Sequence, residues 1–134
     1  MTERIQRIEE FAAASPLAAW LGFTVADEKC ASYELAFHEA HIGNPAIRAL
    51  HGGVIASFLE LSMQAELVGE YGGRVSTVNI SIDYLSSSKP QNMTARVRRL
   101  KVGRRIAFLE AEGWQAGETR LVAVARACFN FGRR

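Results

Sequence analysis

The chain has 134 residues, of which 49% are apolar and 22% are charged, and its formal net charge is +2. These values are typical of a single globular domain, here residues 1–134, that is long enough to bury a hydrophobic core. The small net charge argues against a nucleic-acid partner.

The N-terminal segment, residues 1–21, is predicted to form two short helices. Over residues 3–14 the apolar side chains recur at helical spacing, which indicates an amphipathic helix. Pro16 suits the first turn of a second helical piece, which we expect to end at Gly22.

Nothing in the sequence points to export or to a membrane. Charged residues are scattered through the first ten positions, without the continuous apolar stretch of a signal peptide. No segment approaches the ~20 apolar residues that a membrane span needs. The two cysteines, Cys30 and Cys128, lie far apart and form no metal-binding motif, so we expect free thiols in a cytoplasmic protein.

Two strands are predicted next, over residues 23–29 and 30–38, with a charged turn between them. In the second strand, apolar and polar side chains alternate, which is typical of a half-buried strand. Residues 43–50 contain Gly, Asn and Pro without a clear period and are predicted to form a loop.

A long buried helix is predicted from Gly53 to about Tyr71. Its apolar side chains recur every three or four residues and cover most of the circumference, and Gly72 and Gly73 end it. Glu60 lies inside this apolar run, where an unpaired carboxylate is costly. Such a residue either has a structural partner or is placed for chemistry, and burial would raise its pKa toward the range of a general base.

The remainder of the chain is strand-like, with glycines at the expected turns and bulges, Gly103, Gly113 and Gly117. The predicted strands cover residues 74–86, 91–102, 105–116 and 119–131. Two strands, one buried helix and four more strands indicate an α+β fold in which an antiparallel sheet wraps around a helix.

The stretch HGGVIASFLELSMQAE, followed by VNISIDYLSSSKP and VGRRIAFLEAEGW, resembles the hot-dog-fold acyl-CoA thioesterases of the phenylacetate-degradation (PaaI-like) type. The similarity runs from about residue 22 to residue 131. It implies a six-stranded antiparallel sheet around a long central helix, with dimers that share a continuous sheet and often pair into tetramers. It also implies hydrolysis of an acyl-CoA thioester to a free acid and CoA, with CoA as part of the substrate and no separate cofactor or metal.

The start of the long helix suits a reaction of this kind. Its unpaired N–H groups and positive dipole end can stabilise an oxyanion, and glycines there let a carbonyl approach the backbone. The resemblance assigns the polarising amide to Gly52 and makes Glu60 the base or nucleophile. His51 is a further candidate, although a histidine at this position more often orients the loop through hydrogen bonds.

The spacing of these two groups predicts a site shared by two protomers. Gly52 and Glu60 are eight residues apart on one helix, which separates them by about 12 Å along its axis. A single substrate carbonyl therefore cannot contact Gly52 and Glu60 of the same chain. Two antiparallel helices across a dimer would bring Gly52 of one protomer beside Glu60 of the other, so we expect a monomer to be inactive.

Three polar residues are candidates to support this pair. Asn44 resembles the family's water-positioning or substrate-positioning amide, Gln64 lies one helical turn after Glu60 and is expected to bond its carboxylate, and Thr77 matches a hydroxyl near the attacking water.

The candidate substrate-binding residues divide by the part of the substrate that they would contact. Arginines around the Gly103 turn would bind the CoA phosphates, since guanidinium groups suit phosphate oxygens. The candidates are Gly53 at the carbonyl, Ser87 and Ser88 along the pantetheine arm, Arg99, Arg104 and Arg105 at the phosphates, and Phe58 and Met63 at the acyl group.

Two other functions compete with hydrolysis. Glu60 followed by Gln64 also resembles the acid of hot-dog dehydratases that act on β-hydroxyacyl thioesters, for which His41 or His51 would supply the partner histidine. The second alternative is a non-catalytic acyl-CoA-binding module.

Overall fold

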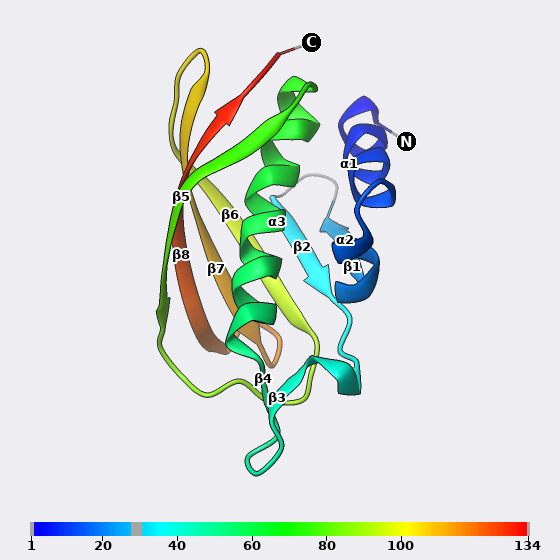
Figure 1. Ribbon diagram of the computed structural model, residues 1–134, viewed down its shortest axis with the longest axis vertical. Helices are drawn as coiled ribbons and strands as arrows, with labels where there is room; N and C mark the ends of the chain where they lie inside the picture. Colours follow the sequence, from blue (N-terminus) through cyan, green and yellow to red (C-terminus); the bar gives the residue numbers. More distant parts are fainter. Residues whose placement is uncertain (1, 28–30, 134) are drawn as a thin grey trace.

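A six-stranded antiparallel sheet wraps around one long helix in the computed structural model of the chain, which describes residues 2–27 and 31–133 (Figure 1). The helices are α1 (Glu3–Ala13), α2 (Pro16–Leu21) and the central α3 (Gly52–Tyr71). In spatial order the strands are β1 (Phe23–Asp27), β2 (Ser32–Leu35), β6 (Met93–Val102), β7 (Ile106–Gln115), β8 (Arg120–Phe131) and β5 (Val75–Tyr84). The predicted α+β architecture is confirmed.

Local signals account for the N-terminal helices. The hydroxyl of Thr2 accepts a hydrogen bond from the backbone N–H of Ile5 and caps α1. Ser15 caps α2 in the same way, Pro16 occupies its first turn, and Gly22 ends it at a φ of 63°. Helix α1 packs against α3, so both N-terminal helices lie on the side of α3 opposite to β5 (Figure 1).

The core lies between α3 and the concave face of the sheet. Small residues on β6, β7 and β8 face the helix there and allow it to lie close to the strands. At Gly113 a Cβ atom would lie 3.1 Å from the sulfur of Met93 and 3.4 Å from a methyl group of Leu59. The predicted bulge at this glycine is present, because the β7–β8 register shifts between Gly113 and Trp114.

The prediction of a plain loop over residues 43–50 is wrong in part. A short hairpin forms there from β3 (Ile42–Asn44) and β4 (Ala49–Leu50), after a 3₁₀ turn over Glu39–His41. Arg48 adopts a φ of 51°, which turns the chain tightly, and two very short strands leave no readable period in the sequence.

Among residues 2–27 and 31–133, no helix combines the length and apolarity that crossing a membrane requires. Cys128 is a buried free thiol. The predicted turn between the first two strands, and Cys30 with it, lies outside the described residues.

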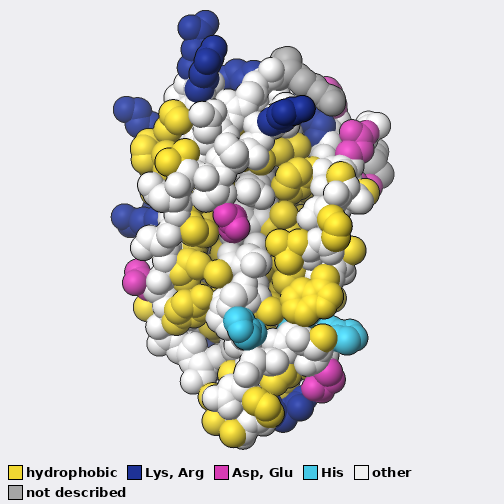
Figure 2. Space-filling view, in the orientation of Figure 1, with side chains coloured by type: hydrophobic (Ala, Val, Ile, Leu, Met, Phe, Trp, Pro, Cys, Tyr) yellow, Lys and Arg dark blue, Asp and Glu magenta, His cyan; other side chains and the backbone are white. Residues whose placement is uncertain are grey.

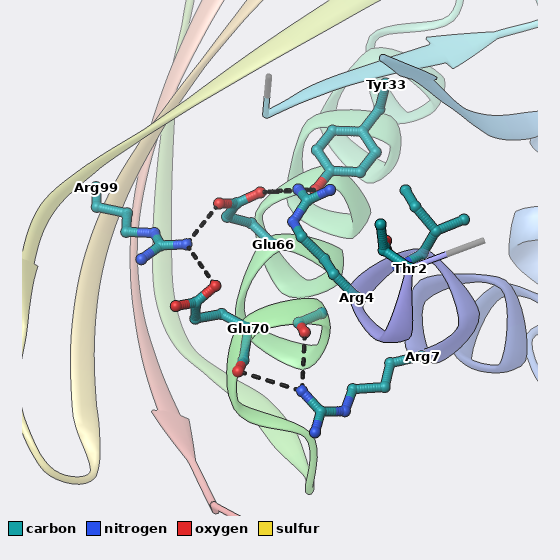
Figure 3. A network of polar contacts seen from close by, with 9 residues as sticks. Thr2, Arg4, Arg7, Tyr33, Glu66, Glu70 and Arg99 are labelled. Atoms are coloured by element: carbon teal, nitrogen blue, oxygen red, sulfur yellow. Dashed lines mark hydrogen bonds and ion pairs between the residues drawn. The ribbon is translucent and has the colours of Figure 1, made fainter. Parts of the chain in front are cut away.

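A buried carboxylate that the sequence did not single out joins α1, α3 and the sheet. Glu66 of α3 is only 5% exposed and accepts hydrogen bonds from Arg4 at 2.7 Å, from the Tyr33 hydroxyl at 2.8 Å and from Arg99 at 2.9 Å (Figure 3). Burial alone would raise the pKa of Glu66, but the bonds from Tyr33 and the two arginines outweigh that effect and lower it. Arg99 also pairs with Glu70 at 3.5 Å.

We expect Glu66→Gln to destabilise the protein by about 2 kcal/mol at pH 7, because two arginines lose a buried anionic partner. The folded-state pKa of Glu66 is lowered, so its contribution is complete above the unfolded glutamate pKa of about 4.3 and is lost as pH falls through the folded value. Urea unfolding at pH 7 and pH 3.5 measures both effects. If the difference in unfolding free energy between wild type and variant does not shrink in acid, this assignment is contradicted. Glu70→Gln, on the exposed side of α3, is the control.

Candidate active site

His51 precedes helix α3 and caps it with both its side chain and its backbone. The ring Nδ1 of His51 accepts the N–H of Gly53 at 2.8 Å, and its carbonyl accepts the N–H groups of Val54 and Ile55 at 3.0 and 3.2 Å. The amide of Gly52 is the exception in this first turn, since it donates to no group in the described part of the chain. A single unpaired N–H therefore stands at the positive end of a long helix, where it favours negative charge.

A cavity of about 420 Å³ opens beside this helix start. Its lining comes from β4, from the first turn of α3 and from the end of β5 with the serine segment that follows: Ala49, Leu50, Gly52, Ile55, Tyr84, Leu85, Ser86, Ser87 and Ser88. The structure thus brings Ser87 and Ser88 to the same cavity as Gly52. Ser88 is buried and its hydroxyl oxygen accepts the N–H of Leu50, so it also holds β4 in place.

The end of β5 contributes a residue that sequence analysis missed. The Tyr84 hydroxyl donates a hydrogen bond to the Gly52 carbonyl at 2.7 Å, and partial burial raises the pKa of Tyr84, which keeps this donor protonated. The available signal was weak: an aromatic residue at the end of an alternating strand, 32 positions from its partner.

Glu60 lies two helical turns beyond Gly52, about 12 Å along the helix axis, and outside the cavity. Glu60 is half-buried rather than buried. It shares with Gln64 a stripe of α3 on the side of the helix that the sheet does not cover. Its carboxylate makes no hydrogen bond or ion pair with any described residue. Figure 2 shows one face of the molecule, on which an acidic group lies between two strips of apolar side chains.

Gln64 and Thr77 meet, although not in the predicted way. The amide of Gln64 donates to the Thr77 hydroxyl at 3.1 Å instead of to Glu60. This bond ties the Glu60 stripe of α3 to β5, the free edge strand of the sheet. The acid therefore lies beside the edge at which a second protomer can add.

The side chains of three other predicted residues make contacts that do not involve Gly52 or Glu60. Asn44 is exposed in the β3–β4 hairpin, where its side-chain oxygen accepts the N–H of Ala46. Phe58 and Met63 are completely buried in the core and line none of the cavities described here. An acyl group could reach them only by displacing the core.

The predicted arginine cluster is divided between two places. Arg104 and Arg105 lie at the β6–β7 turn and line a cavity of about 400 Å³ with Arg133. Arg99 instead points toward α3 and pairs with Glu66, as described above. Neighbouring residues of a strand point to opposite faces, which is why Arg98 pairs with Glu110 whereas Arg99 pairs with Glu66.

The histidines are committed to the fold. His41 is completely buried, its Nε2 lies 2.8 Å from the Trp20 carbonyl, and its Nδ1 accepts the N–H of His38. Both ring nitrogens of His41 are therefore in use. The ring of His51 also serves the fold, through the bond between its Nδ1 and the Gly53 N–H, but the ring is exposed and its Nε2 bonds to no described residue.

The sequence matches a family model described as acyl-CoA thioesterase N-terminal domain over residues 41–131. No curated protein matches the chain significantly. An X-ray structure of a thioesterase-superfamily protein is 25% identical, with a TM-score of 0.90 over 98% of this chain and 100% of the other.

Two further solved structures share the fold. The E. coli PaaI protein from the phenylacetic acid degradation operon is 18% identical, with a TM-score of 0.84 over 98% of this chain and 95% of the other. A phenylacetic acid degradation-related protein from Ralstonia eutropha JMP134 is 21% identical, with a TM-score of 0.76 over 92% and 98%.

Proposed function

The chain belongs to the acyl-CoA thioesterase family and is a thioester hydrolase, and we propose that its reaction takes place at a site shared by two protomers. One protomer supplies the Gly52 amide and the other supplies Glu60. The observation that carries this proposal is that both groups lack partners in the described chain yet lie about 12 Å apart along α3, too far for one carbonyl to contact both.

In the proposed reaction, the thioester carbonyl oxygen accepts a hydrogen bond from Gly52 and gains negative charge as the carbonyl carbon is attacked. Glu60 acts as the base that removes a proton from the attacking water, or attacks the carbon itself and is released by water afterwards. The C–S bond then breaks, CoA leaves with its thiol protonated, and the free acid remains. Gln64 and Thr77, which bond to each other rather than to Glu60, would position the attacking water.

The edge strand β5 supports the proposed dimer. No described strand pairs with its outer edge, and Val78 and Tyr84 on it are 58% and 53% exposed. Exposed edges of this kind are normally covered. Pairing two β5 strands around a two-fold axis would continue the sheet and lay the two α3 helices side by side in opposite directions. We infer a homodimer, or two such dimers in a tetramer.

The substrate would extend along this interface. Leu50, Ile55 and Leu85 give the cavity beside Gly52 an apolar lining that suits the acyl group or the pantetheine arm. Arg104 and Arg105 have no acidic partner among the described residues and would bind the CoA phosphates. CoA is part of the substrate, so the proposal includes no separate cofactor. Cytoplasmic localisation stays a prediction from the sequence.

The test is hydrolysis of a panel of aryl and medium-chain acyl-CoAs, with the released thiol detected by a chromogenic disulfide. We expect thiol release from at least one class of substrate and no hydration of crotonyl-CoA, which is followed by its ultraviolet absorbance. Hydration without thiol release would replace the proposal by a dehydratase. Tight binding of acyl-CoA without turnover would replace it by a binding module.

A further inference from the structure

The two peptide groups on either side of the Gly52 Cα are held by different partners. The preceding peptide is fixed through its carbonyl, that of His51, which accepts two N–H groups of the first turn. The following peptide is held at both ends, because its N–H, that of Gly53, bonds to the His51 ring and its carbonyl, that of Gly52, accepts the Tyr84 hydroxyl. Only the Gly52 N–H is left without a partner in the described chain.

Tyr84 is the part of this arrangement that comes from outside the helix start. Its ring lines the cavity, and its hydroxyl reaches across from β5. The contact is close, since a Cβ atom at Gly52 would lie 3.3 Å from the Tyr84 oxygen. The first turn of a helix frays easily because its N–H groups have no intrahelical partners, so an external bond of this kind restricts its motion.

The same strand is bonded to α3 at a second point, through Thr77 and Gln64. Strand β5 runs alongside α3 in the opposite direction, so Thr77 lies beside the Glu60 region and Tyr84 beside the helix start (Figure 1). The helix start and the turn that follows Glu60 are therefore both tied to the strand at which protomers would pair. Their alignment across the interface depends on these ties.

We propose that Tyr84 is a positioning residue for the oxyanion donor: it holds the Gly52 peptides so that the free amide stays aimed at the substrate carbonyl. This inference rests on the proposed function. A donor fixed before the reaction stabilises the developing charge without reorganising, so Tyr84 acts on the chemical step and not on substrate binding.

The first test is Tyr84→Phe, which removes only the hydroxyl. We expect kcat to fall about three- to tenfold, the range for one hydrogen bond, with KM and the Kd of a non-hydrolysable thioether analogue changed less than about twofold. Tyr71→Phe is the matched control, because the Tyr71 hydroxyl makes no hydrogen bond with any described residue and lies at the other end of α3. An unchanged kcat, or a raised KM with unchanged kcat, would overturn the proposal.

A double-variant cycle separates positioning from a general loss of stability. In a Gly52→Pro background the donor is already absent, so adding Tyr84→Phe should lower kcat by less than about twofold. A full, additive loss would show that Tyr84 acts by another route. Amide exchange at Gly53 gives a readout that needs no activity: it should be faster in Tyr84→Phe than in Tyr71→Phe. Equal exchange overturns the positioning role, whereas an inactive wild type would refute the proposed function alone.

Discussion

Glu60→Gln is expected to lower kcat by about 10³-fold, within the usual range for loss of a general base, while the substrate still binds. The glutamine keeps the size of the side chain but can neither accept the proton of the attacking water nor attack the carbonyl. Because Glu60 has no described hydrogen bond or ion pair to lose, the variant should unfold at the same temperature as wild type. Steady-state hydrolysis and a thermal melt measure the two effects.

Glu70→Gln is the matched control on the same helix. Glu70 is exposed and its ion pair with Arg99 lies at the protein surface, so its loss should leave kcat unchanged. Equal rates for wild type and Glu60→Gln on every substrate cleaved would remove Glu60 from the mechanism. The thioesterase assignment would survive that result, because it rests on the family match and not on this residue.

Gly52→Pro is expected to lower kcat by about 10²- to 10³-fold, the cost of one missing oxyanion donor. The substitution removes the donor N–H without breaking a helix bond, although the added Cβ atom would lie 3.3 Å from the Tyr84 oxygen. Gly52 is the first residue of α3, where proline is well tolerated, and its N–H has no bond to lose. His51 has a φ of −60° and a ψ of 135°, the extended conformation that a residue before proline prefers. Gly52→Ala keeps the amide and serves as the control for added bulk.

Mixing the two inactive variants tests whether the site is shared. In a heterodimer of Glu60→Gln and Gly52→Pro protomers, one site carries both changes and the other carries neither. Random pairing at equal concentrations should therefore restore about a quarter of wild-type activity. Subunit exchange is verified first. If activity is then not restored, each protomer uses its own Gly52 and Glu60, which the helix spacing opposes.

Much of the candidate site was predictable because its signals are local. The cap at His51 involves residues two to four positions away, and the glycines behind it mark the same short stretch. Contacts between distant segments were not predictable in this way. Gln64 was expected to bond Glu60 one turn away, yet it bonds Thr77 on β5, because the sheet edge offers a hydroxyl to that side of the helix.

The arginines show the same limit. Arg99 and Arg104 lie close together in the sequence. Arg99 nevertheless pairs with Glu66 of α3, whereas Arg104 lies at the β6–β7 turn. A register shift between Arg99 and Lys101 further alters which residues face inward along β6. Charge clustering along a strand therefore does not predict a common ligand.

Periodicity, caps and glycines act within a few residues, so the order of the helices and of the six strands of the large sheet, and the start of the central helix, could be read from the sequence. The sequence could not decide which glutamate of that helix stays free. Glu60 and Glu66 both lie in one apolar run, and only the tertiary structure brings Arg4, 62 positions away, and Arg99, 33 positions away, to Glu66. Because Glu66 is buried with charged partners, its role is structural. Glu60 lies on the side of α3 that the sheet does not cover and has no such partner among the described residues.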